Sequence, residues 1–192
     1  NEINQQKKEY KVEVTIADDG SFYNYSFLDN CSRIEKIDNK NIYILEDKVL
    51  KDFLIEQNLK VDGITKWIHF PKINNSMNKA FITNCGVSLS QSDKLLFLDD
   101  DNYFISNNSI ENLINLFNNY DVVFGQIKDN NNRFRSYESY RVQGTTIGIR
   151  KETFNKIGGL GEWTSEFSCA VDSDFWIKLY NYYIKSNLRG CY

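Results

Sequence analysis

The sequence predicts a layered α/β fold, with a mostly parallel central sheet flanked by helices. Segments with the alternating or continuous apolar pattern of strands are followed by segments whose apolar residues fall at helical spacing. This strand-then-helix pattern recurs about every 25 residues, as in chains built from strand–helix–strand units. The 192 residues are 41% hydrophobic and 15% aromatic, enough for the core of one domain, which we expect over 1–192. The first residue is not Met, so we expect segments to be missing at one or both ends.

The first expected strand, 11–17, alternates and is rich in β-branched residues. It runs into a turn signal, Asp-Asp-Gly-Ser at 18–21. Residues 22–36 are ambiguous, because their apolar residues fall at helical spacing. A second strand is expected at 41–45 (NIYIL), and a helix over 47–59 has its apolar residues on one face.

The third expected strand, 66–70 (KWIHF), is closed by Pro71. We expect His69, inside this strand, to be a packed residue and not a ligand. A helix is expected over 76–91. The fourth strand, 94–98 (KLLFL), is almost entirely apolar, which is typical of a strand covered on both faces.

The second half continues the same alternation. A helix is expected over 109–119, followed by strands at 121–125 (DVVFG) and 145–149 (TTIGI). A short helix over 151–157 should stop at the Gly-Gly pair that follows it. A last helix is expected over 172–184.

Composition excludes several classes of protein. A net charge of −3 gives no basic face for nonspecific binding to nucleic acid. No apolar run approaches the roughly 20 residues that span a bilayer, so we expect no transmembrane segment. The single histidine argues against His-rich metal sites and Ser-His-Asp catalysis, and the four cysteines form no CxxC pair. We interpret the cysteines as reduced thiols of a cytoplasmic protein, in the host cytoplasm if the source is viral.

Three adjacent carboxylates follow the fourth strand, at Asp99, Asp100 and Asp101. In α/β sheets, ligands bind beyond the carboxyl ends of strands. Carboxylate oxygens suit Mg²⁺ or Mn²⁺, which are often shared with substrate phosphates. A metal site is one interpretation of this cluster, and a solvated turn is the other.

Three segments, in order, resemble the family 2 glycosyltransferases, which have a Rossmann-like GT-A fold. NKAFITNCGVSLSQSDKLLFLDDDN is similar to the stretch that ends in the family's DxD motif. GTTIGIRKETFNKIGGLGE resembles a later strand, helix start and Gly-Gly turn, and VDSDFWIKL resembles the acidic motif that opens the last helix. The resemblance covers roughly residues 66–185.

The resemblance assigns roles to four carboxylates. It implies that Asp101 ligates a metal and that Asp99 approaches the metal or the nucleotide ribose, with Asp100 in the variable middle position. It implies that Asp172 is the general base. The usual Glu before this residue is Val171 here, which is a departure from the family pattern.

The resemblance also implies residues that bind the nucleotide. Lys79 matches a common lysine, and its charge could replace that of an Arg absent from the Thr-Asn-Cys-Gly stretch at 83–86. Asp18-Asp19 looks like the family motif that ends the second strand, and Ala17 lies beside it. Two registers remain open: one in which 11–17 is the second strand, and one in which it is the first and 41–45 is the second. Strand counting favours the latter, which places Asp47 in the nucleotide pocket.

The implied reaction is transfer of a sugar from a nucleoside diphosphate sugar to an acceptor hydroxyl. By family prevalence the donor is a UDP-sugar, with Mn²⁺ or Mg²⁺ on the departing diphosphate. A base on the opposite face of the sugar would invert the anomeric centre, with Asp172 accepting the proton. The acceptor could be a glycan, a lipid or a protein.

Two other classes stay open. A haloacid-dehalogenase-type phosphatase also has an Asp-x-Asp after an apolar strand, and there Asp99 would be the nucleophile. The second class is a catalytically inactive domain that binds sugar nucleotides. It stays open because Val171 and the missing Arg depart from the family pattern. Nucleotide binding without turnover would identify it.

Overall fold

The computed structural model describes residues 11–61, 63–72, 76–134, 146–186 and 190–191. Within them the chain is mixed α/β, as expected, and forms two compact units. The first unit holds the described residues up to Ser90 together with 162–169, and the second holds those of 91–161 and from Ala170 onward. The expectation of one domain stays a prediction.

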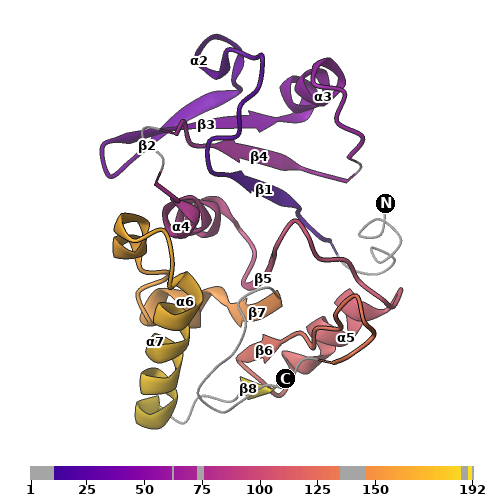
Figure 1. The fold of residues 1–192 in the computed structure, drawn as a ribbon, viewed down its shortest axis with the longest axis vertical. Helices are drawn as coiled ribbons and strands as arrows, with labels where there is room; N and C mark the ends of the chain where they lie inside the picture. The colour runs from indigo at the N-terminus through magenta and orange to yellow at the C-terminus, as the bar shows by residue number, and fades with distance from the viewer. Residues whose placement is uncertain (1–10, 62, 73–75, 135–145, 187–189, 192) are drawn as a thin grey trace. The chain divides into compact units, whose positions relative to one another are not determined.

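The first unit contains a four-stranded sheet in the order β1-β4-β3-β2, seen in purple in Figure 1. Its elements are β1 (Thr15–Asp18), α2 (Phe27–Asn30), β2 (Arg33–Ile37), β3 (Lys40–Glu46), α3 (Asp47–Glu56), β4 (Lys66–His69), α4 (Lys79–Leu89) and the 3-10 helix η1 (Glu162–Glu166). β1 and β4 are parallel, whereas β3 is antiparallel to both β4 and β2.

The expectation of a mostly parallel sheet is therefore wrong for this unit. The reason is a hairpin that joins β2 to β3 through Asp38 and Asn39, which have φ angles of 49° and 62°. A two-residue hairpin turn of type I′ has positive φ at both central residues, and Asp and Asn accept it better than most residues. β2 was not predicted, because the apolar residues within 22–36 fall at helical spacing. The Asp-Asn pair at 38–39 was the sequence signal for the hairpin.

The two faces of this sheet are buried against different helices. Successive residues point to opposite faces, so Ile44 and Ile68 pack against α4, whereas Leu45 and Trp67 pack against α3. The α3 face is rich in aromatic rings, among them Tyr23, Phe27 and Phe53. β4 is buried throughout, so both of its faces are held by packing.

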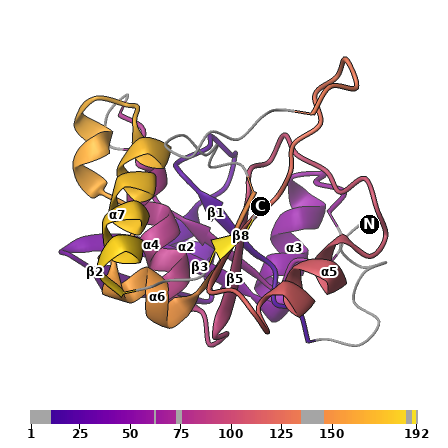
Figure 2. The same ribbon diagram turned by 90° about the horizontal axis from the view of Figure 1, so that it is seen from below.

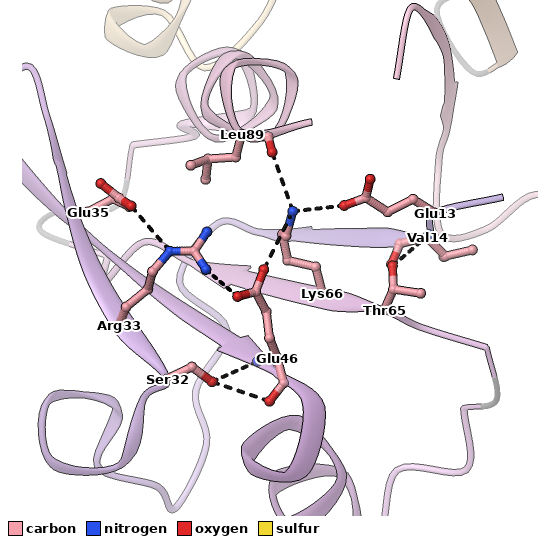
Figure 3. Close-up of polar contacts among 9 residues, drawn as sticks. All are labelled: Glu13, Val14, Ser32, Arg33, Glu35, Glu46, Thr65, Lys66 and Leu89. Carbon is pink, nitrogen blue, oxygen red and sulfur yellow. Dashed lines mark hydrogen bonds and ion pairs between the residues drawn. The ribbon is translucent and has the colours of Figure 1, made fainter. Parts of the chain in front are cut away.

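A buried lysine lies at the start of β4, drawn in Figure 3. The Nζ of Lys66 is 2.8 Å from Oε1 of Glu13, 3.6 Å from Oε1 of Glu46 and 3.4 Å from the carbonyl oxygen of Leu89. Glu46 also forms an ion pair with Arg33. The network joins β2, β3, β4 and the end of α4 at this edge of the sheet.

The second unit contains a four-stranded sheet in the order β5-β7-β6-β8. Its elements are β5 (Lys94–Leu98), α5 (Ser109–Leu116), β6 (Val122–Phe124), β7 (Thr146–Arg150), α6 (Lys151–Lys156), α7 (Val171–Ser186) and β8 (Gly190–Cys191). β7 is antiparallel to both β5 and β6, and β8 is parallel to β6. The mostly parallel expectation is wrong here too, because β7 lies between two strands that both run in the opposite direction.

Helices cover both faces of this second sheet, with α6 and α7 together and α5 apart from them in Figure 2. Phe97 and Phe124 contact rings of Phe154 on α6 and Trp176 on α7. Leu96 is 36% exposed, so the expectation that β5 is covered throughout is wrong. None of the helices within the described ranges is both long and apolar enough to cross a membrane.

We predict that Lys66→Met destabilises the folded chain by about 2 kcal/mol. The Met side chain retains the packing of the aliphatic stem, but it leaves the partly buried Glu13 without its cation and Glu46 with Arg33 alone. The midpoint of urea unfolding at neutral pH measures the loss. The matched control is Lys36→Met on exposed β2, which should change stability by less than about 0.5 kcal/mol. Equal midpoints for the two variants would contradict the role given to Lys66.

Candidate functional site

Asp18 ends β1 as a buried carboxylate whose two oxygens are both engaged. Its Oδ2 lies 2.6 Å from Nδ1 of His69 and accepts a hydrogen bond from Nε1 of Trp67 at 3.3 Å. Its Oδ1 accepts a hydrogen bond from the backbone N–H of Ser21 at 2.9 Å. Asp18 thus ties the end of β1 to β4 and holds the turn that follows.

Burial raises the pKa of Asp18, but hydrogen bonds with His69 and Ser21 outweigh it, and the net pKa lies below its ordinary value. The ring of Phe27 stacks on His69 with a centroid distance of 3.8 Å. His69 is therefore the packed residue that the sequence predicted, and it also positions Asp18.

Asp19 differs from its neighbour in having one oxygen available. Its Oδ2 accepts a hydrogen bond of 2.6 Å from the backbone N–H of Asn78, immediately before Lys79 opens α4. Its Oδ1 is buried and has no hydrogen-bond partner among the described residues. A buried carboxylate oxygen without a partner is costly unless a donor reaches it, so this atom is the candidate contact for a ligand N–H or O–H.

The remaining expected nucleotide residues lie in two different places. Ala17 is exposed and directly precedes Asp18 in β1. Asp47 follows β3, and β3 is antiparallel to β4, so Glu46 pairs with Lys66 at the far end from the Asp18–His69 pair. The register that placed Asp47 in the nucleotide pocket is therefore wrong, because it assumed that β3 runs parallel to its neighbours.

The acidic cluster forms a turn at the carboxyl end of β5 in the second unit. The N–H of Asn102 donates to the carbonyl oxygen of Asp99 at 3.2 Å, and Nδ2 of Asn102 donates to Oδ1 of Asp101 at 2.7 Å. Asp100 and Asp101 are exposed.

This turn fits a hard divalent cation in its donor chemistry, because it offers carboxylate oxygens at the surface. No three His, Cys, Asp or Glu side chains within the described ranges are grouped so as to hold a metal by themselves. The protein would therefore supply only part of a coordination shell. Mg²⁺ and Mn²⁺ are commonly bound in this way, with waters and substrate phosphates completing the shell.

Asp172 lies in the first turn of α7, where its side chain is exposed. Val171 before it is buried and packs in the second unit. Ala170 has a φ of 69°, a left-handed conformation that is strained for a residue with a Cβ, and its carbonyl oxygen accepts the N–H of Asp174. Asp174 also forms an ion pair of 2.8 Å with Lys178, which anchors the helix start.

A cavity of about 850 Å³ opens beside the acidic turn. It is bounded by the end of β5, residues 101–105, α5, the end of β6 and the loop 125–131, and Asp101 is among its lining residues. Sequence patterns did not predict this cavity, because part of its wall is the loop after β6, which has no apolar periodicity.

Within the first unit, the structure brings together Asp18, Asp19 and the start of α4. The second unit holds Asp99, Asp100, Asp101 and Asp172. Both sets lie at carboxyl ends of strands or at a helix start, where α/β folds bind ligands.

Comparison with known proteins identifies the family and the fold. The model of the glycosyl transferase family 2 matches residues 26–178. The chain therefore belongs to this family.

Its fold is similar to that of a mannosyltransferase from Pyrobaculum calidifontis, solved in complex with GDP-Man and Mn²⁺. The TM-score is 0.53 at 12% sequence identity, and the match covers 99% of this chain and 59% of the other. The GT-A-type α/β fold is confirmed, and the chain spans about three fifths of that neighbour's length. No curated protein matches the sequence.

The lowered pKa of Asp18 predicts a specific pH dependence of stability. Because the folded-state pKa lies below the ordinary value of 3.8, the ionised carboxylate stabilises the fold above about pH 3.8. This contribution is lost as the pH falls through the folded-state pKa. Asp18→Asn should therefore cost about 2 kcal/mol near neutral pH and progressively less in acid.

Urea unfolding of wild type and Asp18→Asn at a series of pH values measures the difference. Asp29→Asn, at an exposed carboxylate of the same unit, is the control and should show a small effect throughout. A difference that stays constant from neutral pH to below pH 3 would contradict the anchoring role of the ionised Asp18.

Proposed function

We propose that this protein is a metal-dependent glycosyltransferase that moves a sugar from a nucleoside diphosphate sugar to an acceptor hydroxyl. The observation that carries the proposal is the exposed acidic turn at the end of β5, in a chain that belongs to glycosyl transferase family 2. The first unit adds Asp19, whose buried Oδ1 lacks a described partner.

Asp101 and Asp99 would hold Mn²⁺ or Mg²⁺, with Asp100 beside them toward the donor. When bound, the ion neutralises negative charge on the departing diphosphate. The exposed position of Asp101 suits this task, because the phosphates must also reach the ion. Asn102 holds Oδ1 of Asp101 and so fixes the direction of the carboxylate.

Residues at the end of β1 and the start of α4 would bind the nucleotide. Asp19 can accept an N–H from the base, and Asp18 keeps the turn in place. Ala17 offers exposed backbone next to them, and Lys79 adds a positive charge at a helix N-terminus, where anions are favoured.

Asp172 would act as the general base, taking the proton from the acceptor hydroxyl as it attacks the anomeric carbon. A base near the surface at the start of α7 is accessible to a second substrate. Attack on the face opposite the leaving diphosphate inverts the anomeric centre. The buried position of Val171 means that the residue before Asp172 is a packing residue in this chain.

Two nucleoside diphosphates are candidates for the donor. UDP is a candidate because UDP-sugars are prevalent in the family. GDP is a candidate because the mannosyltransferase of similar fold was solved with GDP-Man. The first experiment therefore tests both nucleotides.

A catalytically inactive domain that binds sugar nucleotides is the second candidate. Val171 in place of the family Glu favours it. It predicts the same nucleotide binding without turnover, so a binding measurement and a turnover measurement together separate the two functions.

We predict that UDP or GDP binds in the presence of Mn²⁺ and that Asp101→Ala weakens this binding at least tenfold, because it removes the carboxylate that links metal to protein. Asp19→Asn should weaken it with and without metal, since Asp19 contacts the base. Isothermal titration calorimetry with each nucleotide, with and without Mn²⁺, measures the constants.

Glu152→Ala is the matched control, because it removes a carboxylate exposed on α6 of the same unit. Its nucleotide affinity should equal that of the wild type. If neither nucleotide binds with Mn²⁺ present, or if Asp101→Ala and Glu152→Ala bind equally well, the donor site is wrongly assigned.

We predict that Asp172→Asn lowers turnover by 10²-fold or more while nucleotide affinity stays unchanged, the range expected for loss of a general base. Release of nucleoside diphosphate from the donor, with acceptor present, measures turnover. Ser173→Ala, at the exposed neighbouring position, should keep full activity. Loss of nucleotide affinity in Asp172→Asn would instead place this residue at the donor.

A further inference from the structure

The cavity of the second unit has the dimensions of a small-ligand site. Its volume of about 850 Å³ falls within the range of roughly 300–1,000 Å³ typical of such pockets. The acidic turn forms one part of its wall, and Asp101 lies on that wall. A ligand in the cavity would therefore lie next to the proposed metal.

Neutral hydrogen-bonding groups dominate the polar part of the wall. Asn112 on α5 and Gln126 after β6 line it from two sides, and Asn130 lies on the following loop. The backbone N–H of Asn112 donates within its helix, but neither the Asn112 nor the Gln126 carboxamide has a hydrogen-bond partner among the described residues, and both residues are exposed. Each carboxamide offers two donors and an acceptor, the combination that neighbouring hydroxyl groups require.

The loop that carries part of this wall is held in place by its own hydrogen bonds. Oδ1 of Asp129 accepts the N–H groups of Asn131 and Arg133, each at 2.9 Å. Lys128 forms an isolated bridge with Phe134. The wall is thus built before any ligand arrives, which reduces the entropic cost of binding.

The charges and apolar groups of the wall narrow the class of ligand. Among the described residues of the wall, Lys128 is the single cation and is opposed by Asp101 and Asp129, so this part of the wall does not suit a second nucleotide or a phosphorylated lipid head. Apolar residues such as Leu98, Leu113 and Phe104 are interrupted by amides, so an acyl chain would leave polar groups unpaired. A polyhydroxylated ring, with polar edges and apolar faces, matches both features.

We propose that this cavity is the acceptor subsite and that the acceptor is an oligosaccharide. This inference rests on the proposed function. Asp172, the proposed base, is not among the residues lining the cavity. The ring held here is therefore not the one whose hydroxyl attacks, and the acceptor has at least two rings.

The test uses saturation-transfer NMR on the full chain with Mn²⁺, with and without the nucleotide that calorimetry selects. The probes are methyl glycosides of glucose, mannose, galactose and N-acetylglucosamine, and the corresponding disaccharides. At least one disaccharide should bind, and more tightly than its methyl monosaccharide. Asn112→Leu and Gln126→Ala should each weaken that binding about tenfold, because each removes one or two hydrogen bonds.

Asn115→Leu is the matched control, with the same substitution on the same helix, at a position outside the cavity wall. It should leave saccharide binding unchanged, and all three variants should bind nucleotide as the wild type does. If nucleotide binds but no saccharide does, the acceptor subsite is wrong while the proposed function stands. If nucleotide binding fails in the wild type, the proposed function itself is wrong.

Two further outcomes would overturn the inference. If the cavity variants raise the KM for the sugar donor and leave saccharide binding intact, the cavity holds the donor sugar. If monosaccharides bind and disaccharides do not, the acceptor lacks the second ring.

Discussion

The parallel pairing of β1 with β4 is the constraint on which the first unit depends. It places Asp18 opposite His69, so that a buried carboxylate joins the ends of two neighbouring strands. Burial alone would disfavour the charge, and donors from Trp67, His69 and Ser21 offset that cost. The same carboxylate fixes the turn that presents Asp19 to the start of α4.

The charged groups at the two ends of β4 differ in whether all of their polar atoms have partners within the protein. At its start, Lys66 is enclosed by carboxylates of the same unit, and the charges are satisfied within the protein. At its end, Asp18 is likewise satisfied, but Oδ1 of the next carboxylate, Asp19, is buried and has no hydrogen-bond partner among the described residues. This oxygen is the one that we propose for contact with a ligand. This asymmetry agrees with the placement of ligand sites in α/β folds.

The local sequence pattern was sufficient to predict most helices and strands. In α3, α5 and β3, for example, the periodic spacing of apolar residues is visible in the sequence and does not depend on which elements pack beside them. Strand direction was not predictable, since it depends on which strands become neighbours, and β3 and β7 both lie antiparallel to theirs. Because β3 was expected to run parallel to its neighbours, Asp47 was expected at the same edge of the sheet as Asp18, whereas it lies at the opposite edge. The positions of Asp18, Asp19 and the acidic turn followed from their place at the ends of strands. The cavity could not be predicted, because it depends on how α5 lies against the loop after β6, which has no periodicity.

The central claim is that the acidic turn after β5 binds the divalent ion that the nucleoside diphosphate needs. A crystal structure of the chain with Mn²⁺ and whichever of UDP and GDP binds tests it most directly. We predict that the ion is bound by the Asp101 carboxylate. An ion held away from Asp101 would contradict the account.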